Sequence, residues 1–581
     1  MALRYLIAVG RSEALKQLPP DICRWQVALD STNCRVWVND SAHTVRFEGK
    51  AGIILGTLFQ GLRAEQVCAT VGEAACTRIL TSNGSHLATA YWGAYVAILL
   101  GAAPGPVQVL RDPSGGLPCY YGDASGVTLI ASDVDTLIDT RWLDVTIDPD
   151  YLKRHILAFD LREPRTALTG ITELLPGFQM LCGTGQPLVV PYWNPWDHVT
   201  PDNASSATQA AELRDTILSV MRSWRLAYDD VLLSVSGGLD SSILATALAQ
   251  AGATVRCLTL STGEPDGDER EKARLVTNAL GFPLIEALYD LEDVDVSRST
   301  SKHLPRPIQS AFAQSGNRIR RTHSGAGGRS VSMMGVGGDN VFCHMRSATP
   351  AIDRFLRHGA GDAFQTLSDI CAMTGCSYGD ALGMAFRRAA RFSNSYRWKP
   401  RPGFMKPPLI PAIAKRLTHP WFEAPRYALP GKAVHIAYLA AIQGTIDGPP
   451  RDQTMLLNPL LSQPIVEACL RIPTWCWCAD GQDRSVARKA FADLLPPPVL
   501  ARRSKGTPET FSFEIVERNR RAIRDIIMDG RLIASGILDE ARLGSALADR
   551  AVLAPPQQLD LLLLAEVEVW CRHWQQRLST K

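Results

Sequence analysis

The chain has 581 residues, of which 46% are hydrophobic and 20% charged, and its formal net charge at pH 7 is +3. This length indicates more than one domain, and this composition is typical of a globular protein. A net charge this small excludes an overall polyanion-binding character.

The fourteen cysteines are scattered and include no C-x-x-C pair, so no zinc site is expected. The sequence also lacks a secretion signal, and we expect reduced, mostly buried thiols in a cytoplasmic protein. Glycines and prolines interrupt the uncharged stretch 87–110, and Glu566, Glu568, Arg572 and Arg577 interrupt the apolar stretch 559–578. We therefore expect no membrane span, and we interpret the second stretch as a terminal helix docked on the core.

Residues from the start to about 196 are predicted to be rich in β-strands. Short alternating runs such as 35–38, 95–100, 107–110 and 127–130 are separated by turn residues. This pattern fits packed two-layer sheets.

Three motifs follow one another in this region: WGAYV at 92–96, RDPSGGLPCYY at 111–121 and ASD at 131–133. Their order is similar to the glutamine amidotransferase domain of asparagine synthetases, and residues 191–196 resemble the junction before the synthetase domain of that family. The resemblance implies an Ntn-type sandwich at the N-terminus.

The amidotransferase resemblance carries one departure at the start of the chain. The family's glutaminase uses an N-terminal cysteine, whose thiolate attacks glutamine and whose free amine is the base. Here residue 2 is Ala2, and the first cysteine is Cys23. We therefore predict no glutaminase activity and expect the degenerate domain to be a scaffold or a binding surface.

The stretch from Val231 to Ser242 combines an apolar strand, a Ser/Gly-rich turn and the start of an Ala/Leu-rich helix. Such a turn directs backbone N–H groups and the positive end of the helix at one point, which suits a phosphate. Its glycines allow close approach, its serines add donors, and its aspartate could hold a bridging Mg²⁺. The expected nucleotide-binding residues here are Leu233, Ser234, Ser236, Gly237, Gly238, Leu239, Asp240, Ser241 and Ser242.

No lysine follows these glycines, so this is not a G-x-x-x-x-G-K-[ST] loop. The stretch resembles the SGGxDSS pyrophosphate loop of the ATP pyrophosphatase superfamily. Those enzymes cut ATP between the α and β phosphates and transfer AMP to a substrate oxygen. The resemblance implies ATP as the nucleotide; a Ser/Gly-rich turn without a ligand is the alternative.

Strand and helix patterns alternate beyond this loop, at 254–260, 268–280, 283–285 and 331–334. The alternation predicts a doubly wound parallel sheet with ligands at the carboxyl ends of its strands. Leu260, at the end of one such strand, is expected to line the nucleotide site.

A second glycine turn, GVGGDN at 335–340, follows the last of these strands. Gly335 and Gly337 would permit close approach to the nucleotide. Asp339 follows the glycines of this turn, as Asp240 follows those of the first turn. The two carboxylates could hold Mg²⁺ against the triphosphate. A turn that only precedes a helix is the alternative.

This second turn is similar to the S-G-x-G-[AS]-D-E signature of asparagine synthetases, with departures. Val336, which can move no proton, stands where those enzymes have glutamate and β-lactam synthetases have tyrosine, and Asn340 replaces the final glutamate. The G-x-G-G-D form beside a degenerate amidotransferase domain resembles the lasso peptide cyclases.

The cyclase resemblance implies adenylation of an Asp or Glu side chain in a precursor peptide, followed by attack of that peptide's N-terminal amine. It further implies a leader-binding protein and a leader peptidase as partners. A peptide amine needs no ammonia, which agrees with Ala2. Three alternatives stay open: an asparagine synthetase that uses ammonia, a β-lactam-type synthetase, and a non-catalytic or RNA-binding relative.

The second half of the chain is predicted to be helical after Asp339. Cations and aromatic residues interleave between Phe386 and Lys406. This stretch could bind RNA, but the weak net charge favours a solvated or peptide-binding surface, and we expect no nucleic-acid partner.

The segment 483–506 resembles the closing R-x-K segment of the family. Lys505 matches the family's catalytic lysine, and Arg503 fits a supporting charge. A cation here would neutralise the pentavalent phosphate and the later oxyanion; a basic surface turn is the alternative. We thus expect an α/β protein with a degenerate glutaminase-like domain at 1–200 and an ATP-binding synthetase domain with a helical extension at 201–581.

Overall fold

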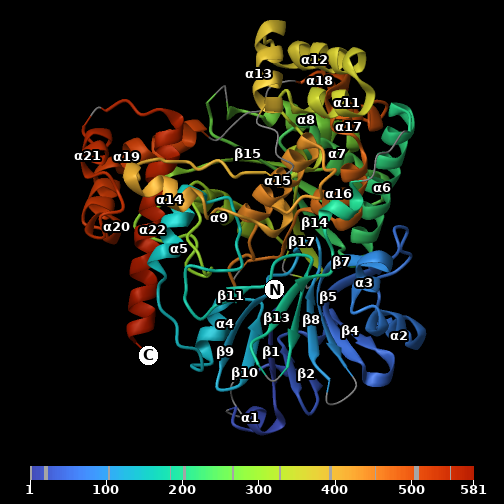
Figure 1. Ribbon diagram of the computed structural model, residues 1–581, viewed down its shortest axis with the longest axis vertical. Helices are drawn as coiled ribbons and strands as arrows, with labels where there is room; N and C mark the ends of the chain where they lie inside the picture. The colour runs from blue at the N-terminus through green and yellow to red at the C-terminus, as the bar shows by residue number, and fades with distance from the viewer. Residues whose placement is uncertain are drawn as a thin grey trace.

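The computed structural model describes residues 3–18, 24–101, 105–183, 185–199, 204–264, 267–325, 327, 329–390, 396–451, 453–502, 509–549 and 551–580. Two sheets form the N-terminal part, and a third forms the centre of the C-terminal part. In Figure 1 the first two lie at the bottom, and the third lies above them under a cover of helices.

The N-terminal part is a sandwich of two mostly antiparallel sheets. The first has the order β11 (Thr172–Glu173), β9 (Tyr120–Ala124), β10 (Val127–Ala131), β1 (Tyr5–Gly10), β3 (Cys34–Val38) and β2 (Gln26–Asp30). The second has the order β13 (Leu188–Pro191), β12 (Phe178–Cys182), β8 (Val107–Arg111), β7 (Tyr91–Leu100), β5 (Gly52–Gln60), β4 (Thr44–Phe47) and β6 (Thr70–Val71).

Alternate residues of facing strands build the core between these sheets. Ile7 and Val9 of β1 lie in one buried cluster with Ile53 of β5 and with Val96 and Ile98 of β7. Because side chains alternate across a strand, their neighbours point to the outer faces. The predicted two-layer Ntn-type sandwich is therefore confirmed.

Helices cover both outer faces of the sandwich. On the second sheet, Cys76 and Ile79 of α2 and Leu87 of α3 pack against β7 residues such as Tyr95. On the first sheet, Leu137 of α4 lies in one buried cluster with Leu6 and Ala8, the outward-pointing residues of β1. The helices and 3-10 turns of this part are α1 (Ser12–Lys16), η1 (Ser41–His43), η2 (Glu48–Lys50), α2 (Glu73–Thr81), α3 (Ser85–Ala90), α4 (Val134–Asp139), α5 (Pro149–Leu157) and η3 (Pro195–His198).

The third sheet is parallel and doubly wound, as predicted. Its order is β16 (Leu284–Leu288), β15 (Val255–Ser261), β14 (Asp230–Ser234), β17 (Ser330–Met334) and β18 (Leu456–Leu457). The helices around it are α6 (Ser206–Ala227), α7 (Leu239–Gln250), α8 (Arg270–Leu280) and α9 (Ala313–His323), with the turn η5 (Leu291–Asp293).

The two faces of this sheet are covered by different helices. Leu233 of β14 shares a buried cluster with Ile243 of α7, whereas its neighbour Leu232 packs with Ile319 of α9. Since successive residues of a strand point to opposite faces, α7 and α9 lie on opposite sides. The carboxyl ends of the strands are left open for a ligand.

The remainder of the chain is helical, as predicted. It comprises α10 (Gly338–Val341), α11 (Thr349–His358), α12 (Ala360–Thr374), α13 (Tyr378–Ala390), η6 (Pro407–Leu409), α14 (Ile410–Ala414), η7 (Pro420–Phe422), α15 (Pro430–Thr445), η8 (Pro459–Leu461), α16 (Gln463–Arg471), η9 (Thr474–Gly481), α17 (Ser485–Ala490), α18 (Pro497–Ala501), α19 (Glu509–Met528), α20 (Arg531–Ala534), α21 (Glu540–Ala546) and α22 (Pro555–Ser579). In Figure 1, α11–α13 form the top of the molecule and α19–α22 its left side. Among the helices that are described, none is long and apolar enough to span a bilayer.

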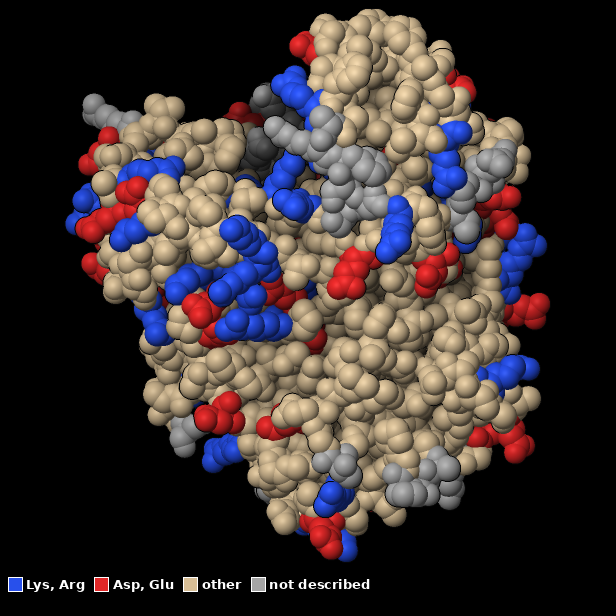
Figure 2. Space-filling view, in the orientation of Figure 1, with Lys and Arg blue, Asp and Glu red and all other residues tan. Residues whose placement is uncertain are grey.

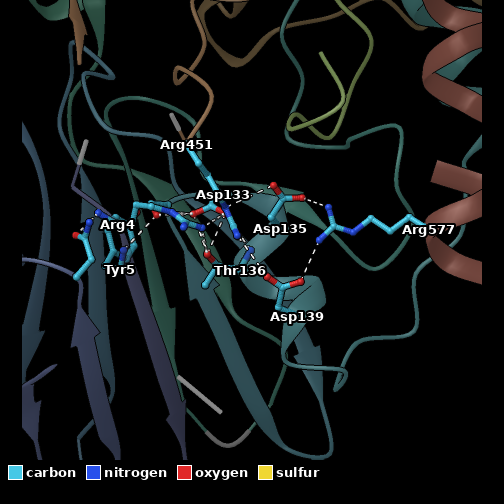
Figure 3. Close-up of polar contacts among 10 residues, drawn as sticks. Arg4, Tyr5, Asp133, Asp135, Thr136, Asp139, Arg451 and Arg577 are labelled. Atoms are coloured by element: carbon cyan, nitrogen blue, oxygen red, sulfur yellow. Dashed lines mark hydrogen bonds and ion pairs between the residues drawn. The ribbon is translucent and has the colours of Figure 1, made fainter. Parts of the chain in front are cut away.

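Acidic residues in and beside α4 connect the N-terminal part to distant segments (Figure 3). Asp133 lies 2.7 Å from Arg4 of its own domain and 3.1 Å from Arg451, which precedes β18. Asp139 lies 3.0 Å from Arg577 of the terminal helix α22. These contacts hold the end of the chain against the N-terminal part.

A buried ion network crosses the same junction. Glu173 of β11 lies 2.8 Å from Arg111, 3.1 Å from Arg162 and 3.3 Å from Arg306, and the last two also pair with Asp447 at 2.8 and 2.6 Å. Burial alone would raise the pKa of Glu173, but the three arginines more than offset this and lower it. This carboxylate therefore stabilises the fold at neutral pH, and its contribution is lost as the pH falls through that lowered pKa.

Replacing Glu173 by Gln should lower the free energy of unfolding by about 3–5 kcal/mol, because it leaves buried guanidinium groups without their common partner. Urea unfolding at pH 7 measures this. The matched control is Asp229→Asn, which breaks the exposed pair of Asp229 with Arg329 and should leave the midpoint unchanged. Equal changes in the free energy of unfolding for the two variants would mean that the buried network stabilises the fold no more than an exposed ion pair does.

Candidate functional site

A cavity of about 650 Å³ lies at the carboxyl ends of β14, β15 and β17. Two glycine turns and an arginine from near α17 contribute to its wall. The predicted residues that line it are Ser234, Ser236, Gly238, Leu239, Asp240, Ser241, Leu260, Gly335 and Asp339. Among the predicted residues that are described, Leu233, Gly237, Ser242 and Gly337 are not part of the lining.

The first turn connects β14 to α7 and is held by its own serines. The hydroxyl of Ser241 accepts from the backbone N–H of Ser236 at 3.3 Å, and the Ser242 hydroxyl donates to the Gly238 carbonyl at 2.8 Å. Gly237 has a φ of +63°, and a Cβ there would lie 2.5 Å from the Cβ of Lys272 in α8. Gly237 and Ser242 therefore shape the loop, while its other residues face the cavity.

The second turn connects β17 to α10 and packs directly on the first. A Cβ on Gly335 would lie 3.0 Å from the backbone nitrogen of Ser241, and one on Gly338 would lie 2.4 Å from Cγ of Asp240. Gly337 has a φ of +90° and lies against Leu461. Glycine is thus required where the two loops meet.

The two predicted metal-binding carboxylates converge on one point. Nη1 of Arg484 lies 3.1 and 3.2 Å from the two carboxylate oxygens of Asp240 and 2.6 Å from Oδ1 of Asp339. Oxygens that share one cationic nitrogen are close enough to share one metal ion. Mg²⁺ is commonly held by one or two carboxylates together with substrate phosphates, so this donor set fits it.

The side chains at this point do not form a complete set of metal ligands. Within the described residues, no group of three or more His, Cys, Asp and Glu side chains gathers as a metal site. Magnesium held here would complete its coordination with phosphate and water oxygens, as it does in many nucleotide enzymes. The site therefore suits a metal that arrives with a nucleotide.

Five charged residues of this cavity were not predicted as site residues: Arg320, Arg346, Arg484, Arg502 and Glu269. Arg502, the residue after α18, pairs with Glu269 and donates to the Ser236 carbonyl at 3.4 Å. Arg484 lies in the segment 483–506, which resembles the closing segment of the family. That resemblance was the only signal in the sequence that could have identified Arg484 as a site residue. Lys505 and Arg503, predicted from the same segment, lie outside the described residues.

The charge balance of the cavity depends on Arg484. Burial alone would lower the pKa of Arg484, but Asp240, Asp339 and Asp483 more than offset this and raise it. The apolar and aromatic side chains of Leu258, Leu260 and Tyr289 also line the cavity. Paired carboxylates, loop amides and apolar wall residues together suit a nucleotide and its metal.

Two family models match this chain. The asparagine synthase family matches residues 219–410 and 457–572, and the glutamine amidotransferase domain family matches residues 73–193. The first match covers more than half of the chain, and the chain belongs to the asparagine synthase family. It is an ATP-dependent carbon–nitrogen ligase with an amidotransferase domain.

A comparison with curated proteins found no match. Among solved structures, the allosteric regulatory enzyme of purine biosynthesis is similar at 11% identity over 49% of this chain and 80% of that chain. The glutamine phosphoribosylpyrophosphate amidotransferase from B. subtilis, complexed with ADP and GMP, is similar at 10% identity over 50% and 85%. Both TM-scores are 0.21, too low to support any statement about activity.

The described cysteines of the N-terminal part offer no reactive thiolate. Cys34, Cys76, Cys119 and Cys182 are buried, and Cys68 is half-buried. Burial raises the pKa of Cys68 and that of Cys76. Burial raises the pKa of Cys119 to about 11 and that of Cys182 to about 12, and it raises the pKa of Cys34 further. Ala2 and Cys23 lie outside the described residues. The absence of glutaminase activity stays a prediction from the sequence.

Replacing Gly338 by Ala should lower the affinity for Mg²⁺–ATP by at least about tenfold, because the new methyl group would displace the carboxylate of Asp240. Isothermal titration calorimetry measures this. Gly361→Ala in α12 is the matched control, since a Cβ there meets nothing within 4 Å. Unchanged affinity in the Gly338 variant would mean that the nucleotide does not use this carboxylate.

Proposed function

We propose that this ligase closes a macrolactam ring in a ribosomal precursor peptide, as in lasso peptide biosynthesis. It adenylates an Asp or Glu side chain of the peptide, and the peptide's own N-terminal amine then displaces AMP. The proposal is carried by the convergence of Asp240 and Asp339 on one point of the cavity wall. That convergence supports Mg²⁺–ATP as the activating reagent.

Activation is needed because an ionised carboxylate resists nucleophiles. A carboxylate oxygen of the peptide attacks the α phosphorus, the bond to the bridging oxygen breaks, and pyrophosphate leaves. The amine nitrogen then attacks the carbonyl carbon of the mixed anhydride, the bond to the AMP oxygen breaks, and the amine proton passes to solvent. The peptide has then lost one water, and ATP has become AMP and pyrophosphate.

The residues of the chain bind and orient the reactants in this scheme. Backbone N–H groups of the first turn would bind the phosphates, and Asp240 and Asp339 would hold the metal. When bound, Mg²⁺ would screen the charge of the triphosphate and of departing pyrophosphate. Lys505, with Arg503 in support, would neutralise the negative charge that develops at the reacting phosphate and carbonyl.

A peptide amine as the nucleophile is supported by two departures in the sequence. Val336 lines the cavity where a proton-transferring side chain is found in the ammonia-using and β-lactam-forming relatives. Ala2 replaces the cysteine that would generate ammonia. An intramolecular amine instead gains its advantage from proximity, so the main task of the site is to hold the peptide folded back and to exclude water.

Lys and Arg side chains gather over α5 and α14 in Figure 2. The predicted basic stretch is divided: Arg387 and Arg388 lie on α13, whereas Arg397 and Lys399 lie on the segment before α14. A peptide-binding surface accords with this arrangement better than one continuous RNA-binding patch, and a leader-binding protein and a leader peptidase are the partners that we propose.

Incubation of a candidate precursor peptide with the ligase and Mg²⁺–ATP should yield a product lighter by one water, together with one AMP per ring. Mass spectrometry and AMP quantification measure this. Lys505→Met should abolish ring closure and leave the melting temperature unchanged. An amide formed from added ammonium, with no ring product, would favour the asparagine synthetase alternative.

A further inference from the structure

Arg484 occupies the position between the two aspartates where a metal ion would bind. Its Nη1 atom contacts both carboxylates, and its side chain is only 12% exposed. Magnesium would sit about 2.0–2.1 Å from the same oxygens. Because Nη1 is 2.6 Å from Asp339, the guanidinium and the metal cannot occupy this position together.

The rest of this guanidinium contacts a third carboxylate, that of Asp483. Its Nε and Nη2 atoms lie 2.8 and 2.7 Å from Asp483. Asp483 in turn accepts from Arg488 at 2.6 Å, and Arg488 also donates to the carbonyls of Leu500 and Arg502. Nε and Nη2 of Arg484 both contact the same oxygen, Oδ2 of Asp483. The guanidinium is rigid and planar, so it can turn as a whole about that oxygen and carry Nη1 away from Asp240 and Asp339.

The backbone at Arg484 is held in an unfavourable conformation. Its φ is +53°, in the left-handed region that residues with a side chain rarely adopt. Such strain persists where surrounding contacts over-determine it, and it concentrates at functional sites. Here the contacts to Asp240, Asp339 and Asp483 account for it, because they direct the side chain into the site.

We propose that Arg484 is a displaceable counter-cation of the metal site. Before the metal binds, its guanidinium neutralises the carboxylates of Asp240 and Asp339. When Mg²⁺ binds with the nucleotide, Nη1 leaves these carboxylates and donates to a phosphate oxygen of the nucleotide. The inference rests on the proposed nucleotide site. It makes Arg484 a positioning residue for the metal and a ligand of the departing pyrophosphate.

This exchange couples the binding of metal and nucleotide. A metal ion that arrives alone must displace Arg484 without offering its Nη1 a new acceptor. A metal ion that arrives with a triphosphate offers one, since phosphate oxygens are good acceptors for guanidinium. The free enzyme therefore binds the bare metal weakly and the metal–nucleotide complex well, and this coupling is reciprocal between the two ligands.

The test measures Mn²⁺ binding to the full-length protein by electron paramagnetic resonance, with and without α,β-methylene-ATP. Arg484→Gln should bind Mn²⁺ about tenfold or more tightly than the wild type without nucleotide, because one positive charge beside the site is removed. The same variant should bind the Mn²⁺–nucleotide complex about tenfold more weakly, because it lacks the phosphate contact. A merely structural role would not move the two affinities in opposite directions.

Two further variants serve as controls. Arg484→Lys keeps the charge, so its affinity for bare Mn²⁺ should stay within about twofold of the wild type. Lys489→Gln removes a cation from α17, the helix that follows Arg484; Lys489 pairs there with Asp480 at 2.8 Å, and its loss should change neither affinity. Arg484→Ala, which removes the same charge, replaces Arg484→Gln if that variant does not fold.

The outcomes separate this inference from the proposed function. Suppose that the wild type binds the Mn²⁺–nucleotide complex, but the folded Arg484→Gln variant binds bare Mn²⁺ no more tightly than the wild type. This result would overturn the role proposed for Arg484 and leave the proposed nucleotide site standing. A wild type that binds no metal–nucleotide complex would overturn the proposed site as well.

Discussion

The contact between two glycine turns is the constraint on which the rest of the site depends. Gly335 and Gly338 lie so close to the first turn that any side chain there would collide with Ser241 or Asp240. This close packing brings Asp240 and Asp339 onto one cation. Two carboxylates forced together repel one another and need a positive charge, and that charge can be supplied by an arginine or by a metal.

The amidotransferase part of the fold is present although Ala2 stands where the family's glutaminases carry their cysteine. A buried carboxylate, Glu173, joins arginines from both parts of the chain, and Trp224 of α6 packs edge-on against Phe59 at 5.2 Å between ring centroids. Removing this part would expose buried charge and aromatic surface of the synthetase part. Structural support alone is therefore sufficient reason for the chain to keep this domain, whether or not the domain releases ammonia from glutamine.

Local sequence patterns predicted the elements that carry the site, because each depends on neighbouring residues. The apolar run ending at Leu233, the glycines after it and the helix from Leu239 are short-range signals, and both acidic turns followed from them. The contact of Glu173 with Arg111 and that of Arg484 with Asp240 could not be predicted, since they join residues 62 and 244 positions apart. Lys505 and Arg503 rest on the resemblance alone.

The most direct test is a crystal structure of the full-length protein with Mn²⁺ and α,β-methylene-ATP, in which anomalous scattering locates the metal. The account predicts one metal peak coordinated by both Asp240 and Asp339 and by phosphate oxygens, with Arg484 turned from the carboxylates to the nucleotide. A metal bound elsewhere, or Arg484 still bridging the two aspartates beside a bound nucleotide, would contradict it.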